Sequence, residues 1–174
     1  MTTFVALLRA VNLGKHGKLP MKDLAAICQR LGFENVQTYI ASGNVVFDSS
    51  KSEKAVKAAL EAALREYAGK PVEVYVRTPA ELQEVVAANP FPKGAPNHTV
   101  AIFLNESPPK DTLRTVTGVK DEEVLLGKRE IYVHYASGIA RSKLKIPAAK
   151  GGTARNMNTI ASLAALGGRE HGRR

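Results

Sequence analysis

The chain has 174 residues, and its 25 Lys and Arg residues against 16 Asp and Glu residues give a formal net charge of +9. No apolar run approaches the roughly 20 residues that a membrane-spanning helix needs, and the single cysteine excludes an internal disulfide. We therefore expect a cytoplasmic protein of one ordinary domain or two small ones, with no membrane partner.

The positive charge is concentrated near the end of the chain. Residues 141–174 contain 8 basic residues and 1 acidic residue, so this segment carries a net charge of +7. Such a concentration favours an anionic partner, either a nucleic acid or a phosphorylated small molecule. A solubilising tail is the alternative, and residues 167–174, which lack apolar periodicity, are expected to fray.

The first half of the chain predicts the order β-α-β-β-α-β. Thr3 to Leu8 is an apolar strand, and the helix that follows Pro20 places Cys28 on its apolar face as a small buried hydrophobe. Thr38 to Asp48 predicts a hairpin around Ser42-Gly43-Asn44, whose last two residues tolerate positive φ. We expect this hairpin at the centre of a sheet.

A second helix and a further strand complete this half. Ser50 and Glu53 fit a capping box, Gly69 ends the helix, and Val72 to Val76 alternate as a half-buried strand. The order is that of the ferredoxin-like split βαβ arrangement, an antiparallel sheet with two helices on one face.

A connecting helix and a loop follow, and then the element order begins again. Thr78 and Glu81 predict a capping box for the connecting helix, and the loop from Asn89 to Asn97 is rich in proline. The second half then predicts a strand, a helix, a hairpin and a last helix: His98 to Leu104, the helix opened by Ser107-Pro108 with Leu113 on its inner side, the hairpin around Gly127-Lys128, and Thr153 to Leu166.

The sequence therefore predicts an α+β fold of duplicated ferredoxin-like βαββα(β) units, with mainly antiparallel sheets covered by helices. The expected division is a ferredoxin-like half at 1–77, a connecting helix and Pro-rich loop at 78–97, a second α+β half at 98–166, and a frayed basic tail at 167–174.

Two glycine-containing basic segments are candidate binding sites. Arg9, Asn12 and Lys15 follow the first strand, in a loop that matches neither a Walker loop nor a dinucleotide fingerprint. Arg155 and Asn156 stand near the expected start of the last helix, together with Arg141 to Lys145 and Lys150 to Thr153. Free N–H groups and the helix dipole would make an anion cradle there, and an ordinary capped helix is the alternative.

We predict that these segments meet in one anion-binding site. Arginines are rarely buried without a partner, and two converging guanidinium groups need an anion between them. The predicted site contains six residues: Arg9, Asn12, Lys15, Ser42, Arg155 and Asn156. The alternative is that each arginine pairs separately with an acidic residue such as Glu34 or Asp48. Histidine and cysteine spacing predicts no metal site, no cofactor is expected, and no catalytic residue can be named.

Three motifs, in this order along the chain, resemble the bacterial family known as domain of unknown function 1697: Ala6 to Gly14, Tyr39 with Ser42 to Phe47, and Ala154 to Thr159. The resemblance spans Phe4 to about Leu166. It implies a cytoplasmic α+β protein with ferredoxin-like halves and no established activity. Ala10 stands where the family generally has glycine, and Met157 where it generally has tryptophan, which would either stack on a ligand or fill the core.

The leading hypothesis is a binding domain for an anionic ligand, either a phosphorylated small molecule or a nucleic acid, at a basic surface. One alternative is an enzyme of unknown reaction with a pocket between the halves. The other is a protein–protein interaction module that assembles through a sheet edge.

Overall fold

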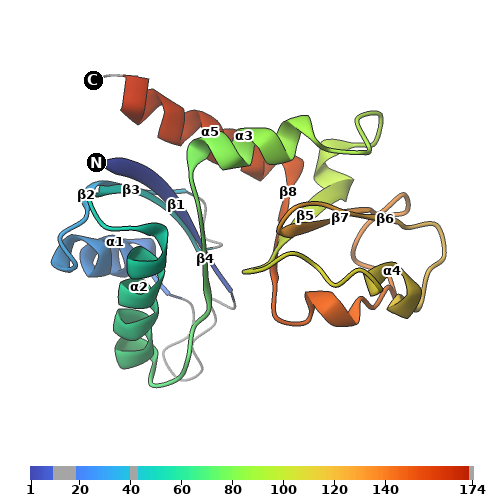
Figure 1. The fold of residues 1–174 in the computed structure, drawn as a ribbon, viewed down its shortest axis with the longest axis horizontal. Coiled ribbons are helices and arrows are strands. Elements are labelled where there is room, and N and C mark those ends of the chain that lie inside the picture. The colour runs from blue at the N-terminus through green and yellow to red at the C-terminus, as the bar shows by residue number, and fades with distance from the viewer. Residues whose placement is uncertain (10–18, 40–42, 173–174) are drawn as a thin grey trace. The chain divides into compact units, whose positions relative to one another are not determined.

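A computed structural model describes residues 1–9, 19–39 and 43–172 of the chain (Figure 1). It contains two compact units, Met1–Leu82 with Ser162–Arg174, and Gln83–Ala161. Each unit is built on one four-stranded antiparallel sheet. The predicted α+β fold with two similar halves is therefore confirmed.

The sheet of unit 1 has the strand order β2-β3-β1-β4. This is the ferredoxin-like order, in which the chain inserts β3 between β1 and β2 and adds β4 at the other edge. The strands are β1 (Thr2–Leu8), β2 (Glu34–Thr38), β3 (Asn44–Ser49) and β4 (Val74–Arg77).

The predicted hairpin is confirmed, but its place at the centre of the sheet is wrong. β2 and β3 pair through Thr38 and Val45, and Gly43 has the positive φ of +80° that the turn requires. β2, however, is an edge strand with no buried residue, whereas all six residues of β3 are buried. The centre of the sheet is formed by β3 and β1.

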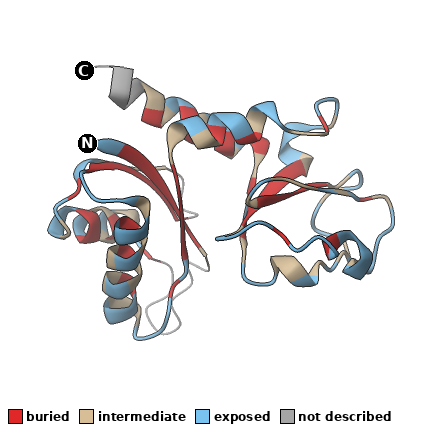
Figure 2. Ribbon diagram, viewed as in Figure 1, coloured by how far each residue is buried: buried red, intermediate tan, exposed pale blue. Residues whose placement is uncertain are grey.

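Two helices cover one face of this sheet, α1 (Met21–Arg30) and α2 (Glu53–Ala68). Their buried residues, which include Cys28, pack against Phe4, Phe47 and the other residues on that face. Figure 2 shows the strands of this core in red. The predicted cap at Ser50 is wrong, because the Ser52 side chain accepts from the Ala55 N–H at 3.2 Å and α2 begins at Glu53.

The other face of the same sheet is also buried and carries polar side chains. The Asp48 carboxylate, 2% exposed, accepts from Thr3 Oγ1 at 2.6 Å and from Asn35 Nδ2 at 2.8 Å. The C-terminal part of α5 (Met157–Gly172) lies near this face, because a Cβ added to Gly167 would lie 3.7 Å from Thr3 Cγ2 and 2.5 Å from Pro79 Cγ. Hydrogen bonding makes this polar burial tolerable.

Unit 2 repeats the sheet topology of unit 1. Its strands are β5 (Thr99–Phe103), β6 (Glu123–Leu126), β7 (Glu130–His134) and β8 (Thr153–Asn156), in the order β6-β7-β5-β8. β5 therefore corresponds to β1, and β8 corresponds to β4.

The helices of unit 2 are much shorter than the sequence suggests. Between β5 and β6 the chain forms the four-residue helix α4 (Thr112–Thr115), and between β7 and β8 it forms the 3-10 turn η3 (Pro147–Ala149). A helix follows Ser107-Pro108 as predicted, but its predicted start is wrong, because it begins only at Thr112, and Leu113, placed on its inner side, is 45% exposed. Leu144, Ile146 and the alanines of η3 take the place of a covering helix over Val100, Ile102, Ile131 and Val133.

The last predicted helix begins later than expected. Thr153 to Asn156 form β8, and α5 starts at Met157 and continues beyond Leu166 to Gly172. The glycines before β8 allow it to approach β5, because a Cβ added to Gly152 would lie 2.7 Å from the Phe103 carbonyl oxygen. The sequence resembled a helix start, but the pairing of β8 with β5 decided the structure.

α3 (Pro79–Ala87) and α5 link the two units, and the division of the chain falls within each of them. The predicted cap of α3 is confirmed: Thr78 N–H donates to Glu81 Oε1 at 2.9 Å, and Glu81 N–H donates to Thr78 Oγ1 at 3.2 Å. The loop between α3 and β5 contains the 3-10 turn η2 (Pro96–His98) and belongs to unit 2.

Candidate functional site

Arg9 lies at the end of β1, with its side chain 40% exposed. Its Nη1 atom is 3.7 Å from Glu73 Oε1, and its backbone N–H donates to the Glu73 carbonyl at 2.9 Å. Arg9 therefore pairs with an acidic residue, as the alternative for each arginine expected, and that residue is Glu73, which precedes β4. Pairing of β4 with β1, which the predicted ferredoxin-like order implies, brings Glu73 to this position.

Tyr75 completes the group around Arg9. Its hydroxyl donates to Glu73 Oε2 at 2.6 Å, so the Glu73 carboxylate contacts both Arg9 and Tyr75. Burial raises the pKa of Tyr75, and the hydrogen bond to Glu73 raises it further. The phenol is therefore a neutral donor that holds the carboxylate beside Arg9.

The loops that follow β1 and β2 begin at the same end of the sheet. The Leu8 N–H donates to the Gly43 carbonyl at 2.8 Å, and Asn44 Nδ2 donates to the Tyr39 carbonyl at 3.0 Å. Three predicted site residues, Asn12, Lys15 and Ser42, lie outside the described residues. Their meeting with Arg9 stays a prediction.

Arg155 is a buried strand residue, not an exposed residue at a helix start. It pairs with Ala101 in the sheet and is 8% exposed. Its Nη1 atom donates to Thr153 Oγ1 at 2.7 Å and to the Ala154 carbonyl at 2.9 Å, and burial lowers its pKa to about 10. The expectation that neither arginine is buried is wrong for Arg155, because polar atoms of β8 solvate its guanidinium.

Asn156 caps α5. Its Oδ1 atom accepts from the Thr159 N–H at 2.9 Å, which satisfies one of the free donors of the first turn. Met157 begins the helix and is 5% exposed, so it fills the core, the second of the two roles expected for that position. The predicted cradle at Lys150 to Thr153 is wrong as a helix start, because that segment leads into β8.

The sequence analysis missed Arg77, the counterpart of Arg155 in unit 1. Arg77 ends β4, is 1% exposed, and donates through Nη1 to the Val76 carbonyl at 3.0 Å. It pairs with Val5 of β1 as Arg155 pairs with Ala101 of β5. In each half, the arginine on the fourth strand is followed directly by the residue that caps the next helix: Thr78 follows Arg77, and Asn156 follows Arg155. This repeated pattern can be seen in the sequence.

Three exposed basic side chains lie in unit 2 before η3: Arg141, Lys143 and Lys145, which we call the basic strip. Arg141 lies in a turn in which the Ser142 N–H donates to the Ile139 carbonyl at 3.1 Å, and Lys143 and Lys145 lie on the extended segment that follows. Ser142, Leu144 and Ile146, which alternate with them, are partly buried. Within the described part of the chain, no ion pair involves the three strip residues. Their charges are therefore available to a partner.

The backbone of the basic strip is held by a neighbouring segment. Thr117 and Lys145 exchange two backbone hydrogen bonds, of 3.0 and 2.8 Å. Gly118, with φ of +73°, lies so close that an added Cβ would be 2.0 Å from the Lys143 carbonyl oxygen. The backbone is thus held at Lys143 and Lys145, in the part of the strip that follows the turn at Arg141.

Glu122 anchors the strip from behind. It accepts from Ser142 Oγ at 2.5 Å and from the backbone N–H groups of Lys120 and Asp121 at 2.7 and 3.2 Å. These hydrogen bonds lower the pKa of Glu122 to about 2, and the one from Ser142 has the largest effect. The carboxylate is therefore committed to the support of the strip.

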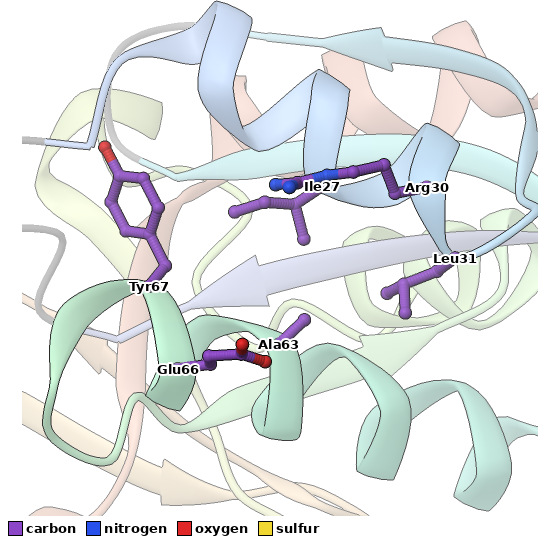
Figure 3. A pocket seen from close by; sticks show the side chains of 6 residues that line it. All are labelled: Ile27, Arg30, Leu31, Ala63, Glu66 and Tyr67. Atoms are coloured by element: carbon purple, nitrogen blue, oxygen red, sulfur yellow. The ribbon is translucent and has the colours of Figure 1, made fainter.

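A groove of about 390 Å³ lies between α1 and α2 of unit 1. Figure 3 shows the six side chains that line it. Ile27, Leu31 and Ala63 form its apolar wall, with Arg30 and Glu66 at its border. Tyr67, which also lines it, donates to Asp23 Oδ2 at 2.7 Å, and that bond raises the pKa of the phenol. A second hollow, of about 360 Å³, lies at the end of α2 and is lined in part by Glu61 and Glu73.

The described residues contain no group of three or more His, Cys, Asp or Glu side chains that could hold a metal ion. Cys28 is fully buried, and burial raises its pKa to about 12, which agrees with the predicted core role. No helix in the described ranges is long and apolar enough to cross a membrane.

Comparison with known proteins gives a family and a fold. Residues 1–132 match the family described as protein of unknown function, DUF1697. The chain is also similar to the solved structure of the conserved bacterial protein SP0830 from Streptococcus pneumoniae, with 24% identity, 97% of this chain and 99% of that chain covered, and a TM-score of 0.79. No curated protein matches the chain. The structural likeness shows a shared fold.

Proposed function

The chain belongs to the DUF1697 family of proteins of unknown function, and from that starting point we propose that it binds an anionic ligand at the basic surface formed by Arg141, Lys143, Lys145 and Lys150. The basic strip is the observation that carries this proposal. Its three side chains are exposed and not neutralised by an ion pair within the described residues, and the backbone is held at Lys143 and Lys145. Several cations gathered on one surface attract anions.

The distribution of charged residues along the sequence supports the same proposal. From residue 131 to residue 169 the sequence contains six Lys or Arg residues and no Asp or Glu. The acidic residues supporting the strip come from the neighbouring segment: Glu122 bonds to Ser142, and Asp121 bonds to Ser137. A cytoplasmic location is part of the proposal, with which the buried thiol of Cys28 agrees.

The six predicted site residues stay a proposal as ligand contacts, each within its own unit: Arg9, Asn12, Lys15 and Ser42 in unit 1, and Arg155 and Asn156 in unit 2. Arg9 is the best residue to test, since its guanidinium is partly exposed and its ion pair with Glu73 is a surface pair worth about 0–1 kcal/mol. Arg155 and Asn156 also hold β8 and α5, so their replacement would change the fold as well.

Thermal unfolding with paired ligands tests the proposal. ATP and pyrophosphate should raise the midpoint, whereas adenosine at the same concentration should not, because only an anion gains from the basic surface. A ligand at 100 times its Kd stabilises the native state by about 2.7 kcal/mol. The Arg9→Gln variant should unfold like the wild type without ligand and show a smaller shift with ATP.

No shift with any phosphate-bearing compound or oligonucleotide would refute the proposed function. A full shift in Arg9→Gln would instead remove Arg9 from the site and leave anion binding in place.

A further inference from the structure

The basic strip combines Arg141, in a turn, with Lys143 and Lys145, which alternate on the extended segment after it. Alternate side chains of an extended segment lie on the same side, about 6.6 Å apart at a rise of about 3.3 Å per residue. Exposure alternates accordingly: Arg141, Lys143 and Lys145 are exposed, and Leu144 and Ile146 turn toward the core of unit 2. The strip therefore offers two lysines on one side of an extended segment and a third cation, Arg141, in the turn before it.

A strip of this kind suits a polyanion better than a small anion. Small ligands are usually enclosed in concave pockets, whereas the strip residues are exposed along their whole length. Successive phosphates of an extended nucleic-acid strand recur at an interval comparable with that of Lys143 and Lys145. Each phosphate could then face one side chain, without the backbone having to move.

Two exposed aliphatic side chains lie beside the strip. Val119 is 54% exposed and follows Gly118, which packs against the Lys143 carbonyl. Ile139 is 48% exposed, and its carbonyl accepts from the Ser142 N–H at 3.1 Å. Apolar groups next to fixed cations can contact the sugars and base faces of a strand whose phosphates the cations hold.

We propose that the basic strip binds the sugar-phosphate backbone of single-stranded nucleic acid, without preference for sequence. This inference rests on the proposed function and names the class of ligand and the residues that hold it. Phosphate contacts carry no sequence information, and the strip offers no planar amide or aromatic side chain with which to read bases.

Fluorescence anisotropy with labelled single-stranded DNA and RNA of random sequence tests the inference between about 50 and 200 mM salt. The variant is Arg141→Gln, Lys143→Gln and Lys145→Gln together. The matched control is Lys22→Gln, Lys51→Gln and Lys54→Gln, three exposed lysines of unit 1. Both variants lose the same net charge, so only the position of the lost charges differs.

Wild-type binding should weaken steeply with salt, because each phosphate contact contributes about −0.7 to the slope of log K against log salt for a single strand. The strip variant should lose about 2 from that slope, for three contacts, and bind roughly tenfold more weakly or worse at low salt. The control should keep the slope. Equal thermal midpoints without ligand would show that both variants fold.

Each other outcome refutes a different statement. Equal losses in the strip variant and the control would overturn the role of the strip while anion binding stands. A thermal shift with ATP or pyrophosphate but no binding of oligonucleotides would overturn the assignment to nucleic acid alone. Tighter binding of duplex than of single strands would overturn the preference for a single strand.

Discussion

Gly118 lies where the basic strip is joined to the rest of unit 2. Its φ of +73° disfavours any L side chain, and a Cβ there would lie 2.0 Å from the Lys143 carbonyl oxygen. We predict that Gly118→Ala lowers the free energy of unfolding by about 2–4 kcal/mol, since the strain of positive φ and a backbone clash act together. Urea unfolding at neutral pH measures the change.

Gly138→Ala is the matched control for Gly118→Ala. Gly138 has φ of +87°, but the nearest atom to an added Cβ is His98 Nε2 at 3.9 Å, an ordinary contact. This variant should therefore show the conformational strain alone, about 1 kcal/mol. If both variants lost the same free energy of unfolding, the contact between the added Cβ and the Lys143 carbonyl oxygen would not destabilise the protein.

Glu122 makes a pH-dependent contribution to stability. Its pKa in the folded protein, about 2, lies below its ordinary value of 4.5, so folding favours the charged form. The contribution is fully present above about pH 4.5 and is lost as the pH falls toward 2. We predict that wild type loses more stability than Glu122→Gln between pH 6 and pH 3, measured by urea unfolding.

Ser142→Ala should raise the pKa of Glu122, since the Ser142 hydroxyl is its largest stabilising partner. The pH dependence of unfolding in this variant should lie between those of wild type and Glu122→Gln. Parallel pH profiles for wild type and Glu122→Gln would mean that the carboxylate does not support the strip.

At the scale of elements, local signals predicted most of unit 1. Its hairpin turn, the capping box at Thr78 and the apolar stripes of α1 and α2 are encoded by neighbouring residues, which a reader of the sequence can see. Strand order then followed from the order of elements. The same order also implies that β2 is an edge strand. The apolar residues on both sides of the turn instead led to the prediction that the whole hairpin lies at the centre of the sheet.

Local signals failed where pairing over long distances decides. Gly151, Gly152 and Thr153 resemble the start of a helix, yet β5 recruits Thr153 to Asn156 as its edge strand. The helix then begins only after Asn156, which caps it. Ser107-Pro108 likewise resembles a helix start, but the following residues do not bury a stripe, and Leu113 stays exposed. A sequence does not show which of its segments a distant strand will pair with.

The same limit applies to the candidate site. Residue types and net charge indicated a basic surface, and the alternation from Arg141 to Lys145 is visible in the sequence. The burial of Arg155 and the pairing of Arg9 with Glu73 both depend on strand partners. Arg77 was not predicted, because the two halves share their topology but few identical residues. The arginine that precedes a helix cap was therefore recognised at Arg155 but not at Arg77.

At the scale of the whole molecule, unit 1 is completed by residues from the far end of the chain. Ser162–Arg174 belongs to unit 1, although β1 to β4 all lie within the first 82 residues. In this part of α5, Leu163 and Ala164 are buried, and Gly167 lies against Pro79 and near Thr3. Removing it would therefore expose apolar surface and the buried polar face around Asp48.

We predict that a chain ending at Ala161 loses several kcal/mol of stability in unit 1, since burying one Leu side chain alone contributes about 1.5–3 kcal/mol. Hydrogen exchange should show reduced protection in β1, β3 and β4, while β5 and β7, which form the centre of the sheet in unit 2, keep theirs. A chain ending at Gly172 is the control, because it retains all of α5 as the structure describes it. Unchanged protection in β1, β3 and β4 of the chain ending at Ala161 would show that α5 is not needed to complete unit 1.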